Sequence, residues 1–204
     1  MEAHLRAGAA VFDAGHHHAA HDAWEERWLE LEAGDDERLL HGLIQYAAVA
    51  HHADEGNWEG VRGLATSAAE YLGPLPADYW GVNVGEVSAY LRRVAADPEH
   101  AERAPPPPLR VDGEAPALAD LDPAAAFVAA PVVAEAVGLD PDPVEAGVEY
   151  ARTDLAAGEE GSRFLRLALD FVGDADHRGV IHQRLAGHVS RRRAKEEDVE
   201  GLFD

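Results

Sequence analysis

Apolar residues recur at three- and four-residue intervals through most of this 204-residue chain. This spacing places side chains on one face of an α-helix, and no stretch shows the sustained alternation typical of a strand. In the first hundred residues it predicts five helices, over about 2–14, 16–33, 37–55, 58–72 and 84–96. Gly15, Gly34 and Gly56 fall where successive helices are expected to end, and Asn57 and Asn83 are suited to begin the next ones.

The pattern changes over residues 97–120, where Asp97-Pro98 and the run Pro105 to Pro108 disfavour both helix and central strand. This composition predicts a linker. Asp122-Pro123 then resembles the start of a helix, and three more helices are expected over about 143–157, 161–172 and 176–195. We therefore predict an all-α protein: a multi-helix bundle over 1–96, a proline-rich linker over 97–120, and a second, smaller helical region over 121–204.

Charge changes this picture most. The formal net charge is −22, with 39 acidic against 17 basic residues, and Lys195 is the single lysine. Such a surface is typical of proteins that work in molar salt, where screening removes self-repulsion. The 47% hydrophobic content argues against disorder as the explanation. We therefore interpret the chain as a halophile-type protein, and its charge disfavours general nucleic-acid binding.

Features that the sequence lacks exclude several classes of protein and of site. The chain has no cysteine, which excludes disulfides, thiolate nucleophiles and cysteine-based metal sites. Its N-terminus lacks the basic and apolar regions of a signal peptide, and no apolar run approaches the roughly 18 residues of a spanning helix. Gly-rich phosphate loops, nucleophile elbows and paired-carboxylate motifs are also missing. We expect a soluble, cytoplasmic protein with no membrane contact.

Polar side chains interrupt the apolar faces of the second and third predicted helices. On the second, His21 and Glu25 are four residues apart, and Trp28 extends the same stripe. The third helix carries a similar stripe, formed by His41, Gln45, Ala48 and His52. Helix propensity does not explain these groups.

Two interpretations of the stripes remain open. If the two helices pack antiparallel, His21 and Glu25 face the His52 end of the third helix. Two imidazoles and a carboxylate are the ligand set of a zinc or non-haem iron site with an open position. The alternative is a buried polar network in which the side chains satisfy one another or a water and set the helix register.

Several separate motifs occur in one order: Phe12-x-x-Gly15, Ala20-His21-Asp22-x-x-Glu25-x-x-Trp28, Arg38-x-x-x-Gly42-Leu43-Ile44-Gln45 and His52-x-x-x-Gly56-Asn57-x-x-Gly60. Over roughly residues 8–72 the chain thereby resembles the family catalogued as domain of unknown function 309. The resemblance implies a compact all-helical bundle with no established activity. The signature residues that it implies are His21, Glu25, Trp28, Arg38, Gln45, His52 and Asn57. Departures from the usual family residues occur at His17, Asp22 and His41.

Three charged segments each allow two interpretations. Arg38, at the start of the third helix, could hold a phosphate or carboxylate ligand, or form an ion pair with Glu25, Glu26 or another acid. The run Arg191 to Lys195 complements a helix dipole, or else contacts nucleic acid or an acidic partner. The acidic segment 198–204 carries apolar anchors that suit docking on its own core or on another chain.

Two classes of function follow. The first is a binding or interaction module with a polar inter-helix site formed by His21, Glu25, Trp28, Arg38, His41, Gln45, His52 and Asn57. Its partner would be another protein or a second copy of the chain. The second is a metal-dependent, hydrolase-like enzyme that holds zinc or iron through His21, Glu25 and His52, while Gln45 or Arg38 orients the substrate.

Overall fold

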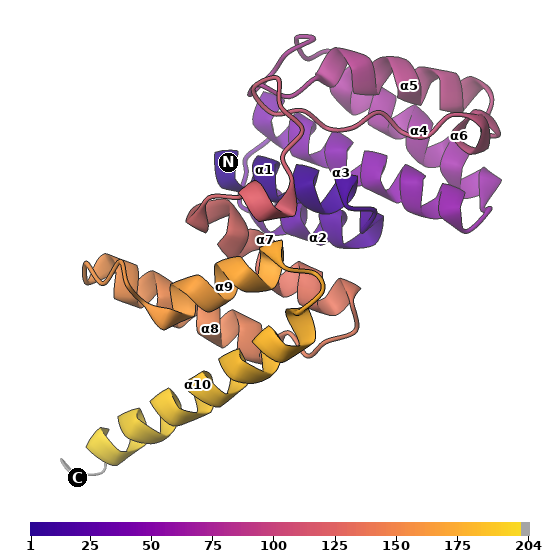
Figure 1. Ribbon diagram of the computed structural model, residues 1–204. Coiled ribbons are helices and arrows are strands. Elements are labelled where there is room, and N and C mark those ends of the chain that lie inside the picture. Colours follow the sequence, from indigo (N-terminus) through magenta and orange to yellow (C-terminus); the bar gives the residue numbers. More distant parts are fainter. Residues whose placement is uncertain (201–204) are drawn as a thin grey trace. The chain divides into compact units, whose positions relative to one another are not determined.

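The computed structural model describes residues 1–200 and shows an all-helical protein (Figure 1). Over these residues it contains ten α-helices, one short 3₁₀-helix and isolated β-bridges, but no strand. The predicted all-α fold class is confirmed. The chain divides into two compact units, Met1–Leu118 and Ala119–Asp204, which are described separately below.

The first unit is an array in which each of the first five helices packs against the next one along the chain (Figure 1). A one-turn helix follows them. Their bounds are α1 (Glu2–Asp13), α2 (His17–Trp28), α3 (Asp35–Asp54), α4 (Trp58–Leu72), α5 (Val84–Ala96) and α6 (His100–Arg103).

Glycines permit the tight turns and the close helix contacts of this array. Gly15 and Gly56 follow α1 and α3 with φ angles of 84° and 70°, which favour glycine. Within the helices, a Cβ atom on Gly8 would lie 2.1 Å from the Trp24 indole, and one on Gly42 would lie 2.4 Å from a Leu72 methyl. Gly42, which belongs to one of the sequence motifs, therefore lies where two neighbouring helices touch.

The second helix ends earlier than the sequence predicts, at Trp28 instead of about Ala33. Beyond Trp28 the backbone hydrogen bonds join residues three positions apart, from Glu30 N to Arg27 O and from Leu31 N to Trp28 O. Leu29 is 70% exposed, so the apolar stripe does not continue into the core at this point. The leucines of the turn satisfied the sequence pattern without being buried on a helix.

Residues 97–118, within the segment whose composition predicts a linker, belong to the first unit and contact its helices. The carbonyl oxygen of Pro107 accepts a hydrogen bond from the Tyr46 hydroxyl at 2.7 Å. Leu109 is buried and its amide donates to the Asp13 carboxylate at 3.1 Å. Prolines cannot donate, but their carbonyls remain acceptors, and here they are used as such.

The second unit begins near a 3₁₀-helix at Leu118–Asp120, and four longer helices follow: α7 (Pro123–Ala136), α8 (Asp142–Ala156), α9 (Arg163–Gly173) and α10 (Arg178–Glu200). The predicted cap at Asp122 is present, because its carboxylate accepts a hydrogen bond from the Ala125 amide at 2.9 Å. Apolar faces of all four helices form the core, which includes Phe127, Phe171 and Leu185. The acidic segment 198–204 lies largely outside the described residues.

Among the described residues, no helix is both long enough and apolar enough to span a membrane.

Candidate functional site

Two hydrogen bonds show that α2 and α3 run antiparallel, which the sequence could only suppose. At one end of the pair, His17 Nδ1 lies 2.8 Å from a carboxylate oxygen of Asp54. At the other end, the Trp28 indole nitrogen donates to Glu37 at 2.9 Å. The start of α2 therefore faces the end of α3, and the polar stripes of the two helices share one interface.

Three side chains of α2 with metal-ligand chemistry lie close together. One ligand atom each from His21, Asp22 and Glu25 lies within 4.8 Å of the other two. Asp22 already touches His21, since its carboxylate oxygen is 2.8 Å from Nδ1. The side chains of His21 and Asp22 are 29% and 34% exposed, so the group is half-buried and not sealed in the core.

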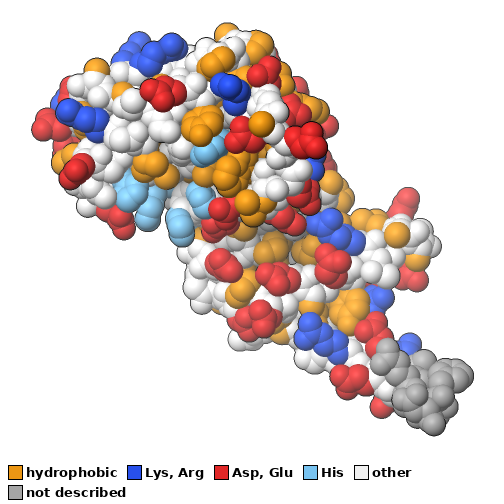
Figure 2. Space-filling view, turned by 180° about the vertical axis from the view of Figure 1, so that it is seen from behind, with side chains coloured by type: hydrophobic (Ala, Val, Ile, Leu, Met, Phe, Trp, Pro, Cys, Tyr) orange, Lys and Arg blue, Asp and Glu red, His pale blue; other side chains and the backbone are white. Residues whose placement is uncertain are grey.

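Further histidines surround this group and form a histidine face on the α2–α3 side of the first unit. Ring centroids are 6.1 Å apart for His18 and His21, 5.3 Å for His18 and His51, and 5.8 Å for His51 and His52. Figure 2 shows imidazoles gathered on one face of the molecule. Histidines of both helices thus lie beside the three-residue group, although His52 is not a member of it.

Trp28 and His41 belong to a second cluster, at the opposite end of the helix pair. One carboxylate oxygen of Glu37 accepts from the Trp28 indole at 2.9 Å and lies 3.2 Å from His41 Nδ1. The His41 ring packs on Trp28 and on Tyr71 of α4, with centroid distances of 4.8 Å and 3.9 Å. Glu37 and Tyr71 were not singled out from the sequence, although Glu37 lies four residues before His41 and so shares its face.

Arg38 is exposed and lines a hollow of about 610 Å³ between the start of α3 and the end of α4. No carboxylate of residues 1–198 lies within ion-pair distance of it, so the structure does not pair it with Glu25 or Glu26. Glu37 and Glu70 line the same hollow, and their negative charges disfavour a bound phosphate or carboxylate there.

Gln45 is half-buried on α3, and its amide oxygen is fully buried. No described residue donates a hydrogen bond to that oxygen. The buried Trp24 indole nitrogen of α2 also lacks an acceptor among the described side chains. This indole packs directly on the Gly8 backbone of α1. The buried Gln45 oxygen is therefore open to a hydrogen bond from a bound water or ligand.

His52 and Asn57 form the turn between α3 and α4. The Asn57 side-chain oxygen caps α4 by accepting from the Gly60 amide at 3.1 Å, while its Nδ2 donates to His52 Nδ1 at 3.0 Å. A Cβ atom on Gly60 would lie 2.9 Å from Asn57 Nδ2, so glycine makes room for the cap. This part of the signature therefore has a structural role in the turn.

The sequence did not single out His188, and for the run Arg191 to Lys195 it left open a basic helix end or a contact with nucleic acid or an acidic partner. The structure places His188, Arg191, Arg192 and Lys195 around a hollow of the second unit. The contacts that create this site come from α8 and α9, so spacing along α10 alone gave no signal for it.

Comparison with known proteins supports the resemblance given by the motifs. Residues 5–64 match the family model described as "Domain of unknown function (DUF309)". This interval contains every signature residue named above. A protein of Aquifex aeolicus (strain VF5), described as an uncharacterized protein, is 27% identical over 95 residues, which is 47% of this chain. The matched region spans only 28% of that protein's length.

Proposed function

We propose that the first unit is a binding module whose polar α2 face holds a divalent metal ion through His21, Asp22 and Glu25. The observation that carries this proposal is the mutual approach of three ligand atoms to within 4.8 Å. Imidazole and carboxylate together suit zinc and other first-row divalent ions. A net charge of −22 also draws cations toward the surface.

The distances fit an ion after small side-chain rotations. Zinc bonds to histidine nitrogen and carboxylate oxygen are about 2.1 Å long, so two ligands of one ion can be at most about 4.2 Å apart. His21 and Glu25 are separated by one helical turn and need only converge slightly. Half-exposure of His21 and Asp22 leaves room for water to complete the coordination.

A calorimetric titration with Zn²⁺ tests the proposal, using protein without an affinity tag that has been dialysed against a chelator. We expect a single high-affinity event that is lost in His21→Ala and strongly weakened in Glu25→Gln. His177→Ala is the matched control, because His177 is exposed and also contacts an aspartate, at 2.9 Å, in the second unit. Equal affinity in His21→Ala and the control would refute the site.

The histidine face requires a second control. His18 and His51 could attract zinc without any specific site, since exposed histidine runs bind such ions readily. The double variant His18→Ala/His51→Ala should retain the high-affinity event if His21, Asp22 and Glu25 form the site. Loss of binding in that variant alone would assign the zinc to the histidine face.

The alternative function is a metal-dependent hydrolase that uses His52 as an additional ligand. It is favoured by the ring series from His18 through His51 to His52, which brings the end of α3 beside the α2 histidines. The hypothesis predicts that His52→Ala weakens zinc binding and abolishes a zinc-dependent hydrolysis of nitrophenyl esters. Zinc binding that is unchanged in His52→Ala would exclude His52 as a ligand and favour the binding module.

An interaction with another protein, or with a second copy of the chain, remains a prediction. Light scattering after size-exclusion chromatography in molar KCl checks it. A strict monomer that captures no partner would count against this role.

A further inference from the structure

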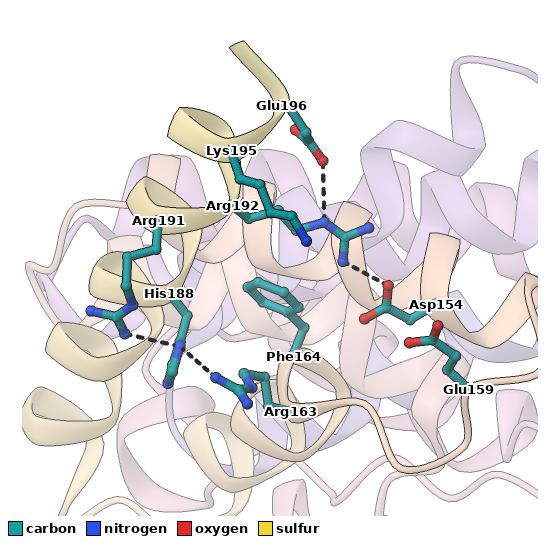
Figure 3. Close-up of a pocket in the computed structure, with 9 residues that line it drawn as sticks. All are labelled: Asp154, Glu159, Arg163, Phe164, His188, Arg191, Arg192, Lys195 and Glu196. Atoms are coloured by element: carbon teal, nitrogen blue, oxygen red, sulfur yellow. Dashed lines mark hydrogen bonds and ion pairs between the residues drawn. The ribbon is translucent and has the colours of Figure 1, made fainter. Parts of the chain in front are cut away.

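The second unit contains a hollow of about 730 Å³ between α9, α10 and the turn after α8 (Figure 3). The Phe164 ring lies near its centre. Arg191 and His188 lie to one side of this ring, and Asp154 and Glu159 to the other. The two sides therefore differ in charge.

Arg192 is fully committed to the framework of the hollow. It donates to Asp154 at 2.6 Å and to Glu196 at 3.2 Å. Its guanidinium also stacks over the Tyr150 ring, 4.2 Å from the centroid. These contacts fix the α8 side of the hollow, and the two carboxylates already compensate the charge of Arg192.

Arg163, Arg191 and Lys195 differ from Arg192, because no carboxylate of residues 1–198 lies within ion-pair distance of them. Instead, Arg163 and Arg191 both donate to one imidazole nitrogen, His188 Nδ1, at 3.3 Å and 2.9 Å (Figure 3). Burial, reinforced by the two neighbouring arginines, lowers the pKa of His188, so the ring stays neutral and accepts from both. Two positive groups are thereby held side by side without a counter-charge.

Acidic residues outnumber basic ones by 39 to 17. This hollow differs from the rest of the surface because three basic side chains without an ion pair to residues 1–198 line it, and two of them meet at one imidazole nitrogen. Isolated cations that share one hollow repel one another unless an anion joins them. Guanidinium groups offer paired N–H donors that match the oxygens of phosphate.

We propose that this hollow binds a phosphate monoester, with its phosphate group between Arg163 and Arg191 and its organic part beside Phe164. A phosphate ion alone would fill a small part of about 730 Å³, a volume suited to a small organic molecule. Glu159 on the far side disfavours a second negative group at the other end of the ligand. His188 acts as a positioning residue that holds the two arginines.

Phenyl phosphate is the probe, titrated calorimetrically into the whole chain at pH 8 and constant KCl, in parallel with inorganic phosphate and phenol. Phenyl phosphate should bind more tightly than inorganic phosphate, and phenol should not bind. Arg191→Gln and Arg163→Gln should each lower the affinity at least about tenfold, the scale of a hydrogen bond to a charged group. Arg193→Gln is the matched control, because Arg193 is exposed on α10 and does not line the hollow.

Circular dichroism of each variant confirms that it is folded before binding is compared. His188→Ala should weaken phenyl phosphate binding, and its melting temperature should equal that of the Arg193→Gln control. A variant Glu159→Gln should improve binding of 4-carboxyphenyl phosphate, which carries a second negative group, more than binding of phenyl phosphate.

Three results would overturn the proposal. Equal affinities for phenyl phosphate in Arg191→Gln and Arg193→Gln would remove the arginines from the site. Binding of inorganic phosphate as tightly as the ester would show a simple ion site without a place for the organic part. Binding of a single-stranded oligonucleotide, with none of phenyl phosphate, would assign the cations to a polyanion. None of these outcomes depends on zinc binding in the first unit.

Discussion

Replacing Asn57 by alanine removes two hydrogen bonds from the turn between α3 and α4. The Gly60 amide loses its cap, which costs about 1 kcal/mol in comparable helices. His52 Nδ1 loses its donor, and for an exposed neutral pair the cost is about 0.5 kcal/mol. We therefore expect the free energy of unfolding to fall by about 1.5 kcal/mol.

Urea unfolding at constant KCl, followed by tryptophan fluorescence, measures this loss. Trp24, Trp28, Trp58 and Trp80 are the four tryptophans of the chain, and all belong to the first unit. The signal therefore reports the unit that contains Asn57.

Two variants separate the contributions at Asn57. Asn57→Ser keeps a capping oxygen and loses only the donor to His52, so it should cost about 0.5 kcal/mol. In a double-mutant cycle, His52→Ala and Asn57→Ala should be coupled by a similar amount. Unchanged stability in Asn57→Ala would refute the structural role of this pair and favour a ligand-binding one.

Other parts of the fold give three further predictions. Gly42→Ala should destabilise the first unit in the same urea assay, because overpacking against a leucine methyl 2.4 Å away costs about 1–3 kcal/mol and the gain in helix propensity is about 1 kcal/mol. Gly63→Ala should stabilise this unit, because a Cβ atom there meets nothing within 4 Å. Burial raises the pKa of Asp154, but hydrogen bonds from Ser162 and Arg192 outweigh it and bring the pKa below the ordinary 3.8. The stabilisation by Asp154 is therefore complete above pH 3.8 and is lost as the pH falls through the lower folded pKa, so Asp154→Asn should melt at a lower temperature than the unmodified protein at pH 7 and by a smaller margin near pH 3. Finally, the acidic surface should loosen the fold on desalting, and identical circular dichroism in molar and millimolar KCl would contradict this interpretation.

Helices and turns were largely predictable because their signals are local. Apolar spacing located the helices, and Gly56-Asn57 marked a turn whose cap the structure contains. The end of α2 was mispredicted because Leu31 continues the apolar spacing of Trp24 and Trp28, although the helix ends at Trp28. The packing of Pro107 on Tyr46 could not be foreseen, since it joins residues 61 positions apart.

The candidate sites were less predictable because they depend on contacts between helices. His21 and Glu25 were expected on one face from their four-residue spacing. Asp22 lies off that stripe, and only the structure shows that it joins the three-residue group through its contact with His21. His188 carried no sequence signal, because its function as an acceptor depends on Arg163 of another helix. Periodicity describes one helix at a time, so it gives the face of a side chain and not the residue opposite.

Metal content tests the central claim most directly. Protein purified without an affinity tag, exposed to Zn²⁺ and freed of excess metal by gel filtration, should retain about one equivalent of zinc per chain by elemental analysis. The double variant His21→Ala/Glu25→Gln, handled identically, should retain less than about a tenth of an equivalent. Equal zinc content in the two proteins, or less than about a tenth of an equivalent in both, would contradict a metal site on α2.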